Sequence, residues 1–273
     1  MAPPLTALTL GACLVALAGY ALALASLVRA IRSRASPPSL LISLPTLTAL
    51  LAHAIAAGSA IWRGDGHVYL GLAESATLFT LTVTAFVCAA AIRRPVLTLH
   101  LFTLPMSMVA LSALAFFSGE STRVEAPSPA LVSHIVLSAC AYSLLCMAAS
   151  QALIVLWQDH TLRAKRELDV LRVLPPLETM ETVLFFQLWV GFLMLTLAIA
   201  SGFAFLDDLF AQQVAHHTVL SISSWIVYAV LLLGHYRFGW RGHTVTYGAL
   251  GAFALLLLAY FGSKFVLEIV LGR

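Results

Sequence analysis

Long apolar stretches, separated by short segments that hold most of the charge, divide this chain into eight parts. Each stretch has about the 20 residues with which an α-helix crosses the hydrocarbon core of a bilayer. None alternates apolar with polar residues as a strand of a membrane β-barrel does. The pattern therefore predicts an all-α polytopic membrane protein, a bundle of about eight transmembrane helices. The predicted spans are 5–28, 39–62, 68–92, 95–117, 130–157, 182–206, 217–236 and 244–267.

Composition agrees with this assignment, because 61% of the residues are hydrophobic and only 10% are charged. A soluble domain of this length needs more charge to cover its surface. The net charge of +3 comes from short connections and forms no continuous basic stripe, so no nucleic-acid partner is expected. No connection is long enough to separate two domains, and residues 1–273 are predicted to form a single transmembrane domain.

The basic residues concentrate in alternate connections, which predicts an orientation. The positive-inside rule places these connections in the cytoplasm of a bacterium and both termini outside, in the periplasm. Because Arg29 follows the first apolar stretch and no Lys or Arg precedes it, that stretch is interpreted as a retained span. In the longest cytoplasmic connection, 158–181, we expect a short helix at the membrane surface. The basic residues of the four cytoplasmic connections are Arg29, Arg32, Arg34, Arg93, Arg94, Arg163, Lys165, Arg166, Arg172, Arg237 and Arg241.

Several polar residues lie inside the predicted spans, where a polar group is costly and calls for a partner or a function. In the fifth span, His134 and Tyr142 follow one another at helical spacing from the outer end. His53 and Glu74 lie in the outer halves of the second and third spans. The seventh span carries a polar face made of His217, Ser221, Ser224, Trp225, Tyr228 and His235.

The predicted topology brings His53, Glu74, His134 and His217 toward the outer leaflet and leaves His235 on the inner side. His217 and His235 are about 27 Å apart along one helix and cannot bind the same iron. Two imidazoles on facing helices suit a six-coordinate haem iron. Two structural alternatives stay open. Some of these histidines could simply lie at the level of the lipid headgroups. Glu74 is either a proton-handling or propionate-orienting group or a capped carboxylate at the membrane interface.

Several segments form a pattern of their own: Leu-Ser-Ile-Ser-Ser-Trp-Ile-Val-Tyr at 220–228, Gly-His-Tyr-Arg-Phe-Gly-Trp-Arg-Gly at 234–242, Tyr-Phe-Gly at 260–262, and Ser-His-Ile at 133–135 with Ala-Tyr at 141–142. These segments resemble those of the cytochrome c assembly family. The resemblance covers most of residues 40–273, and its strongest block is 217–262. It implies that His134 is the family's external histidine and His235 its transmembrane histidine. Relatives that carry haem to the exterior have a tryptophan-rich loop where this chain has 207–213. Pro175-Pro176-Leu177, before the sixth span, resembles the YpjD-type inner-membrane branch, which lacks that loop.

From these observations we predict a haem-binding protein of the bacterial inner membrane that handles haem in cytochrome c biogenesis and is not an enzyme. Its expected partners are haem, the lipid bilayer and other membrane proteins of cytochrome c biogenesis. Phosphate-loop, HExxH and GxSxG motifs are absent from the sequence, so neither an ATPase nor a metalloprotease is supported. The predicted iron ligands are His134 and His217, and the predicted cofactor-binding residues are His134, His217, His53, His235, Glu74, Tyr142 and Trp225.

Two other functions stay open at this point. One is a cofactor-free membrane scaffold or regulator that acts on protein partners through connection 158–181. The other is a small-solute or ion transporter that uses Glu74 and the polar face of the seventh span.

Overall fold

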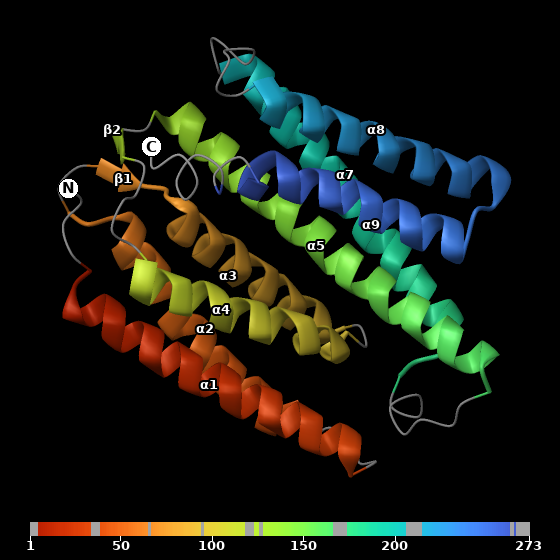
Figure 1. The fold of residues 1–273 in the computed structure, drawn as a ribbon, viewed down its shortest axis with the longest axis horizontal. Helices are drawn as coiled ribbons and strands as arrows, with labels where there is room; N and C mark the ends of the chain where they lie inside the picture. Colours follow the sequence, from red (N-terminus) through yellow and green to blue (C-terminus); the bar gives the residue numbers. More distant parts are fainter. Residues whose placement is uncertain are drawn as a thin grey trace. The chain divides into compact units, whose positions relative to one another are not determined.

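The computed structural model describes residues 5–33, 39–64, 67–93, 96–117, 123–125, 128–165, 174–205, 215–262 and 265. Within these residues, eight helices are long and apolar enough to cross a membrane, which confirms the predicted fold class. The chain divides into two compact units (Figure 1). The first unit contains 1–127 and 167–174, and the second contains 128–166 and 175–273. The predictions of a single transmembrane domain and of outer termini stay predictions.

The elements follow the predicted order. Those of the first unit are α1 (Ala7–Arg32), α2 (Ser39–Ile61), β1 (His67–Tyr69), α3 (Leu72–Ala91), the 3-10 turn η1 (Leu97–Leu99), α4 (His100–Phe117) and β2 (Arg123–Glu125). Those of the second unit are α5 (Pro129–Arg163), α7 (Leu177–Phe205), α8 (Ala215–Phe238), α9 (His243–Leu257) and the π-helical turn η2 (Leu258–Gly262).

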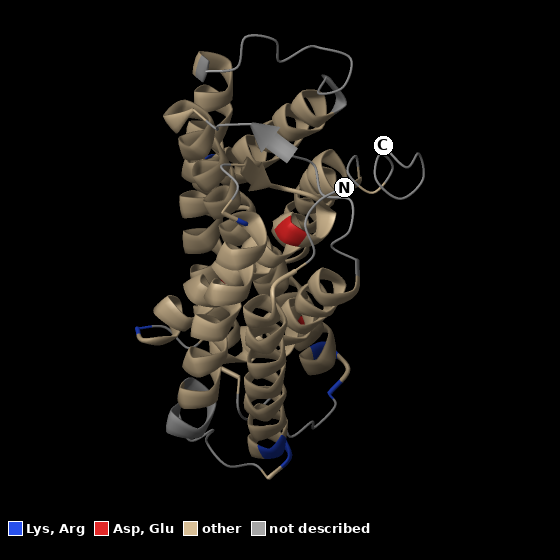
Figure 2. Ribbon diagram, turned by 90° about the vertical axis from the view of Figure 1, so that its left-hand side faces the viewer, with Lys and Arg blue, Asp and Glu red and all other residues tan. Residues whose placement is uncertain are grey.

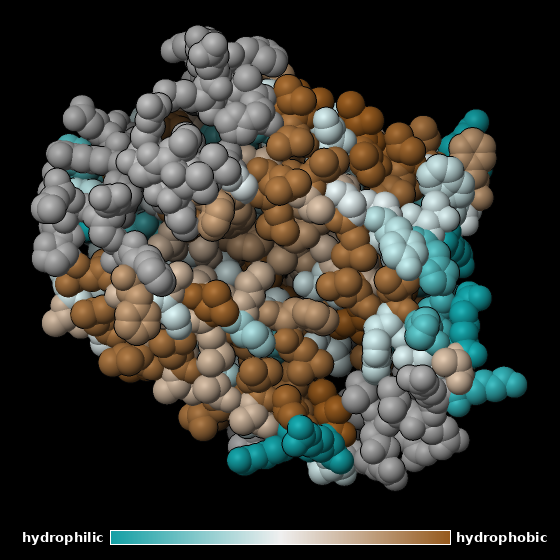
Figure 3. Space-filling view, viewed as in Figure 1, coloured by the Kyte–Doolittle hydropathy of each residue, from teal (hydrophilic) through white to brown (hydrophobic). Residues whose placement is uncertain are grey.

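Charged side chains are nearly confined to helix ends and connections, while the sides of the helices are apolar (Figures 2 and 3). Large hydrophobic side chains such as Leu14, Phe116 and Leu233 are more than half exposed along the spans. In water such surfaces would drive aggregation, but in a bilayer they contact lipid at no cost. The surface therefore fits a protein that crosses the membrane several times.

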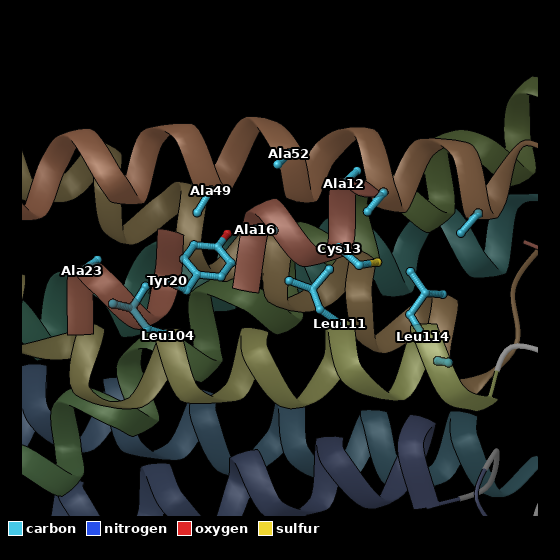
Figure 4. Close-up of a cluster of buried hydrophobic side chains, with 13 residues drawn as sticks. Ala12, Cys13, Ala16, Tyr20, Ala23, Ala49, Ala52, Leu104, Leu111 and Leu114 are labelled. Atoms are coloured by element: carbon cyan, nitrogen blue, oxygen red, sulfur yellow. The ribbon is translucent and has the colours of Figure 1, made fainter. Parts of the chain in front are cut away.

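Small residues bring the helices of the first unit close together. A Cβ at Gly19 of α1 would lie 2.8 Å from the Cβ of Ala49 and 2.9 Å from the carbonyl oxygen of Pro45, so the two backbones approach as only glycine permits. Alanines of α2 and leucines of α4 complete the buried cluster around Tyr20 (Figure 4). The alanine-rich face of the second span is thus a packing face.

A two-stranded antiparallel sheet in the first unit was not predicted. Strand β1 pairs with β2 in the register His67↔Glu125, and Trp62 forms a further bridge to Val68. The strands have three residues each. Runs this short carry no periodicity from which a strand can be inferred.

In the second unit, α5 packs along α7, and α9 packs against both α5 and α8. Helix α5 has 35 residues and continues to Arg163, where Asp159 accepts a hydrogen bond from the Arg163 side chain one turn away. The first part of the connection expected to hold a surface helix is therefore a continuation of the span. The rest of that expectation, at 166–173, lies outside the described residues.

Candidate functional site

The second unit has two ends that carry polar side chains. The end with the start of α5, the start of α8 and η2 is called the outer end, after the predicted orientation (Figure 1). The end with the last turns of α5, the start of α7 and the α8–α9 turn is called the inner end.

His134 lies at the outer end, in the second turn of α5. The helix begins just before it, where the Ser128 side chain accepts the backbone N–H of Leu131. His134 Nδ1 is 2.9 Å from Ser201 Oγ of α7, and that hydroxyl donates to the carbonyl oxygen of Ala198 at 2.8 Å. Because a hydroxyl has one proton, Nδ1 must be the donor to Ser201. The hydrogen-bond network thus assigns the proton to Nδ1 and leaves the lone pair on Nε2.

This is the arrangement of metal-ligating histidines, whose second nitrogen donates to a fixed acceptor that sets tautomer and ring orientation. Ser138 Oγ lies 3.5 Å from Nε2, at the limit of a hydrogen bond. His134 is half-buried. It therefore combines a fixed imidazole with an Nε2 whose hydrogen bond to Ser138 is weak at most.

An aromatic cluster lies next to it at the outer end. Tyr142, two turns along α5 from His134, packs edge-on against Tyr260 of η2 with ring centroids 6.1 Å apart. His217, in the first turn of α8, contacts the same Tyr260 ring at 6.0 Å. The π-helical turn η2 positions Tyr260 between them, and such turns are frequent at functional sites.

Two buried hydroxyls accompany this cluster. Tyr142 Oη and Ser221 Oγ are both buried, and the two hydroxyls face each other as a hydrogen-bonding pair. One O–H of such a pair donates to the other hydroxyl, so one O–H donor remains. A polar group of a bound molecule, or an ordered water, can accept from it.

The polar face of the seventh span otherwise packs helices together. Trp225 Nε1 donates to Thr196 Oγ1 of α7 at 2.9 Å, and the indole stacks on Phe192. Ser224 donates to the carbonyl oxygen of Ala252 in α9 at 2.7 Å. These contacts give Trp225 a role in joining α8 to α7.

His235 lies at the inner end, far from His217 on the same helix. Its Nδ1 is 2.8 Å from the carbonyl oxygen of Trp240, which can only accept, so Nδ1 carries a proton. The ring stacks on Phe185 of α7. His235 is therefore also a fixed imidazole, at a position separate from His134.

The turn that supplies the Trp240 carbonyl explains the Gly-Trp-x-Gly spacing. Gly239 and Gly242 have φ of +67° and +60°, a region that residues with a Cβ rarely adopt. A Cβ at Gly234 would overlap the Trp240 indole, which folds back onto α8. The three glycines thus hold the backbone that fixes His235.

In the first unit, His53 is fully buried and both ring nitrogens are hydrogen-bonded. Nε2 is 3.1 Å from the Thr77 carbonyl oxygen and must donate to it, so Nδ1 accepts from the Tyr20 hydroxyl at 3.0 Å. To bind iron, His53 would have to break one of these buried hydrogen bonds. Its contacts are those of a histidine that holds α1, α2 and α3 together.

Glu74 forms a buried ion pair that sequence reasoning did not identify. Its Oε1 accepts from Arg63 Nη2 at 2.9 Å, and the two side chains are 1% and 4% exposed. Arg63 also donates from Nε to the Ala60 carbonyl oxygen and lies with Cζ 4.4 Å from the Tyr69 ring centroid. The sequence offered one signal for this pair: Arg63 stands at the end of one span and Glu74 follows eleven positions later, at the start of the next.

The structure thus gathers only part of the predicted site. His134, Tyr142 and His217 share the outer end of the second unit with Ser221 of the predicted polar face. Ser201 and Tyr260 also lie there, and neither was among the predicted site residues. His235 lies at the inner end, while His53 and Glu74 belong to the first unit. Among the described residues, no group of three or more His, Cys, Asp or Glu side chains is arranged to hold a metal ion.

Comparison with known proteins places the chain in a family. A model of the family described as cytochrome C assembly protein matches residues 6–271. The inner membrane protein YpjD of Escherichia coli strain K12 is 32% identical over 94% of this chain and 98% of its own length. An uncharacterized 28.8 kDa protein of Azospirillum brasilense, from a nifR3-like 5′ region, is 32% identical over 79% of this chain and 83% of its own. No solved structure matches.

These matches and the eight membrane-length helices confirm a multi-pass inner-membrane protein. The chain belongs to the cytochrome c assembly protein family.

Proposed function

We propose that this protein binds haem at the outer end of its second unit and handles it in cytochrome c biogenesis, without catalysing a bond-making reaction. The observation that carries the proposal is the hydrogen-bond chain from His134 Nδ1 through Ser201 to the Ala198 carbonyl. It prepares His134 Nε2 to act as an axial ligand of iron. Haem, when bound, supplies an iron that alternates between the ferric and ferrous states.

His217 is the proposed second ligand, because it lies at the same end and shares the Tyr260 contact with Tyr142. The buried Tyr142–Ser221 pair would donate its remaining O–H to a polar group of the cofactor. The apolar helix faces of the second unit suit the edges of a porphyrin. His235, with Nδ1 held by Trp240, is the candidate for a second, inner position.

Three predicted residues are left out of the proposed ligand shell on physical grounds. His53 has both nitrogens engaged, Glu74 is paired with Arg63, and Trp225 donates to α7. The pairing of Glu74 also speaks against the transporter hypothesis, because this carboxylate would have to leave a buried ion pair with Arg63 to bind a solute or ion.

The test is the absorption spectrum of protein purified in mild detergent from haem-replete cells, oxidised and then reduced. We expect a Soret band and, on reduction, sharp α and β bands of low-spin iron. His134→Ala should remove the low-spin bands, while His160→Ala, an exposed histidine on the same helix, should keep them.

Ser201→Ala should keep the bands but weaken haem affinity about 10-fold or more, as loss of a residue that orients a ligand does. A visible spectrum that stays flat after addition of haemin refutes the proposal. Bands that are identical in the wild type and His134→Ala refute the ligand assignment.

A further inference from the structure

A pocket of about 300 Å³ opens at the inner end of the second unit. Its three walls come from the last turns of α5, the first turns of α7 and the α8–α9 turn. Val155, Leu156 and Leu177 give it an apolar lining. Charged side chains also line it, and the outer-end site does not include any of them.

The charged groups of the pocket are balanced. Asp159 Oδ2 accepts from Arg163 Nε and from His243 Nε2, each at 2.9 Å. Glu181 Oε1 accepts the backbone N–H of Gly242 at 3.1 Å. The two carboxylates of the pocket, Asp159 and Glu181, are matched in number by the guanidiniums of Arg163 and Arg241.

The charged side chains of the pocket keep hydrogen-bond donors and acceptors that these bonds do not use. Within the described residues, Arg241 makes no hydrogen bond or ion pair, and Arg163 uses only its Nε. Guanidinium groups with free N–H donors bind the oxygens of a phosphate in bidentate fashion. Glu181 Oε2 remains as an acceptor, which an ammonium group with its three donors can use.

We propose that this pocket binds a phosphoethanolamine group, the headgroup of phosphatidylethanolamine. A pocket with equal numbers of carboxylates and guanidiniums matches a zwitterion better than it matches an anionic headgroup. The phosphate meets Arg241 and Arg163, and the ammonium meets Glu181. The apolar lining takes the glycerol and the first carbons of the acyl chains.

The surroundings of the pocket favour a lipid over a soluble phosphomonoester. Exposed aromatic side chains occur at the same end of the unit, with Trp157 in the last turns of α5, Tyr236 near the end of α8 and Tyr247 in the first turns of α9. Such residues mark the depth of the headgroups in a bilayer. Hydrophilic residues gather over this end of α8 and α9, next to brown apolar helix sides (Figure 3). The lipid would belong to the cytoplasmic leaflet in the predicted orientation.

The experiment measures the Tm of the delipidated protein in detergent after addition of lipids with identical acyl chains. Phosphatidylethanolamine, at about 100 times its Kd, should raise Tm by about 5–11 °C. Phosphatidylglycerol lacks the ammonium, and phosphatidylcholine has a quaternary one that cannot donate, so each should raise Tm less. Neither result depends on haem.

Two variants locate the effect. Arg241→Gln should abolish the shift, and Glu181→Gln should make phosphatidylethanolamine no better than phosphatidylcholine. Arg237→Gln is the matched control, because Arg237 is an exposed arginine at the same helix end that does not line the pocket. Arg163→Gln tests the site independently, should Arg241→Gln lower Tm before any lipid is added.

Three outcomes would overturn the proposal. The first is a shift from phosphatidylglycerol as large as that from phosphatidylethanolamine. The second is a full shift in Arg241→Gln and Arg163→Gln, equal to that in Arg237→Gln. The third is an equal shift from free O-phosphoethanolamine at the same concentration, which would assign the pocket to a soluble ligand.

Discussion

Replacing Glu74 with alanine leaves Arg63 without the carboxylate oxygen that lies 2.9 Å from its Nη2. The Arg63 side chain is 4% exposed, so water cannot replace the lost partner unless the side chain moves. Removing one member of a buried ion pair costs about 3–5 kcal/mol, mainly because the other charge stays buried and unpaired.

Two further contacts decide where in that range the value falls. Arg63 Nε still donates to the Ala60 carbonyl oxygen at 3.0 Å, and its guanidinium still lies 4.4 Å from the Tyr69 ring centroid. These two contacts still stabilise the Arg63 guanidinium after Glu74 is removed. We therefore expect a loss of about 3 kcal/mol in the free energy of unfolding, the lower end of the range. With about 2–4 °C per kcal/mol for a chain of this size, Tm should fall by about 6–12 °C.

Thermal unfolding of the purified protein in one detergent measures this loss. Glu178→Ala is the matched control, because Glu178 is an exposed glutamate in the first turn of α7. The double variant Arg63→Met with Glu74→Leu should recover most of the Tm, since neither buried charge remains. If Glu74→Ala melts within about 2 °C of Glu178→Ala, the ion pair is not a buried interaction and the reasoning fails.

Three smaller changes should also shift Tm in the same measurement. Gln187→Leu should raise Tm, because both polar atoms of that buried side chain lack a hydrogen-bond partner among the described residues. Each such atom costs about 1–3 kcal/mol of stability. A lower Tm would mean that bound water or another group satisfies them. Gly234→Ala should destabilise by about 1–3 kcal/mol because its Cβ would overlap the Trp240 indole, whereas Gly58→Ala, in open space on a helix, should be neutral or stabilising. Tyr20→Phe should cost about 1–3 kcal/mol by leaving the buried imidazole of α2 without its donor, and an unchanged Tm would contradict the assigned tautomer.

The spans could be predicted from the sequence because a bilayer imposes a length and an apolar composition on each helix separately. The continuation of α5 to Arg163 could not, because charged residues end an apolar run without ending a helix. The sheet of β1 and β2 depends on pairing between segments more than 50 residues apart, which no local pattern encodes.

For the candidate site, the sequence could identify residue types but not their partners. His53, His134 and His235 look alike in a span, and only their neighbours distinguish them. The partners that matter here are the Tyr20 hydroxyl, the Ser201 hydroxyl and the Trp240 carbonyl. A serine in a span gives no signal of its own, because its hydroxyl commonly donates to a carbonyl of its own helix.

The glycine turn between α8 and α9 bears on how relatives of this chain should be sorted. Its Gly-Trp-x-Gly spacing follows from two positive φ angles and an indole seated on Gly234, and none of these contacts involves a cofactor. Natural selection can therefore preserve the motif for the backbone alone. A homologue that has lost its ligand would still display it. A survey could aim to separate the members that bind a cofactor from those that kept only the scaffold. Such a survey should instead ask whether the positions equivalent to His134 and Ser201 change together.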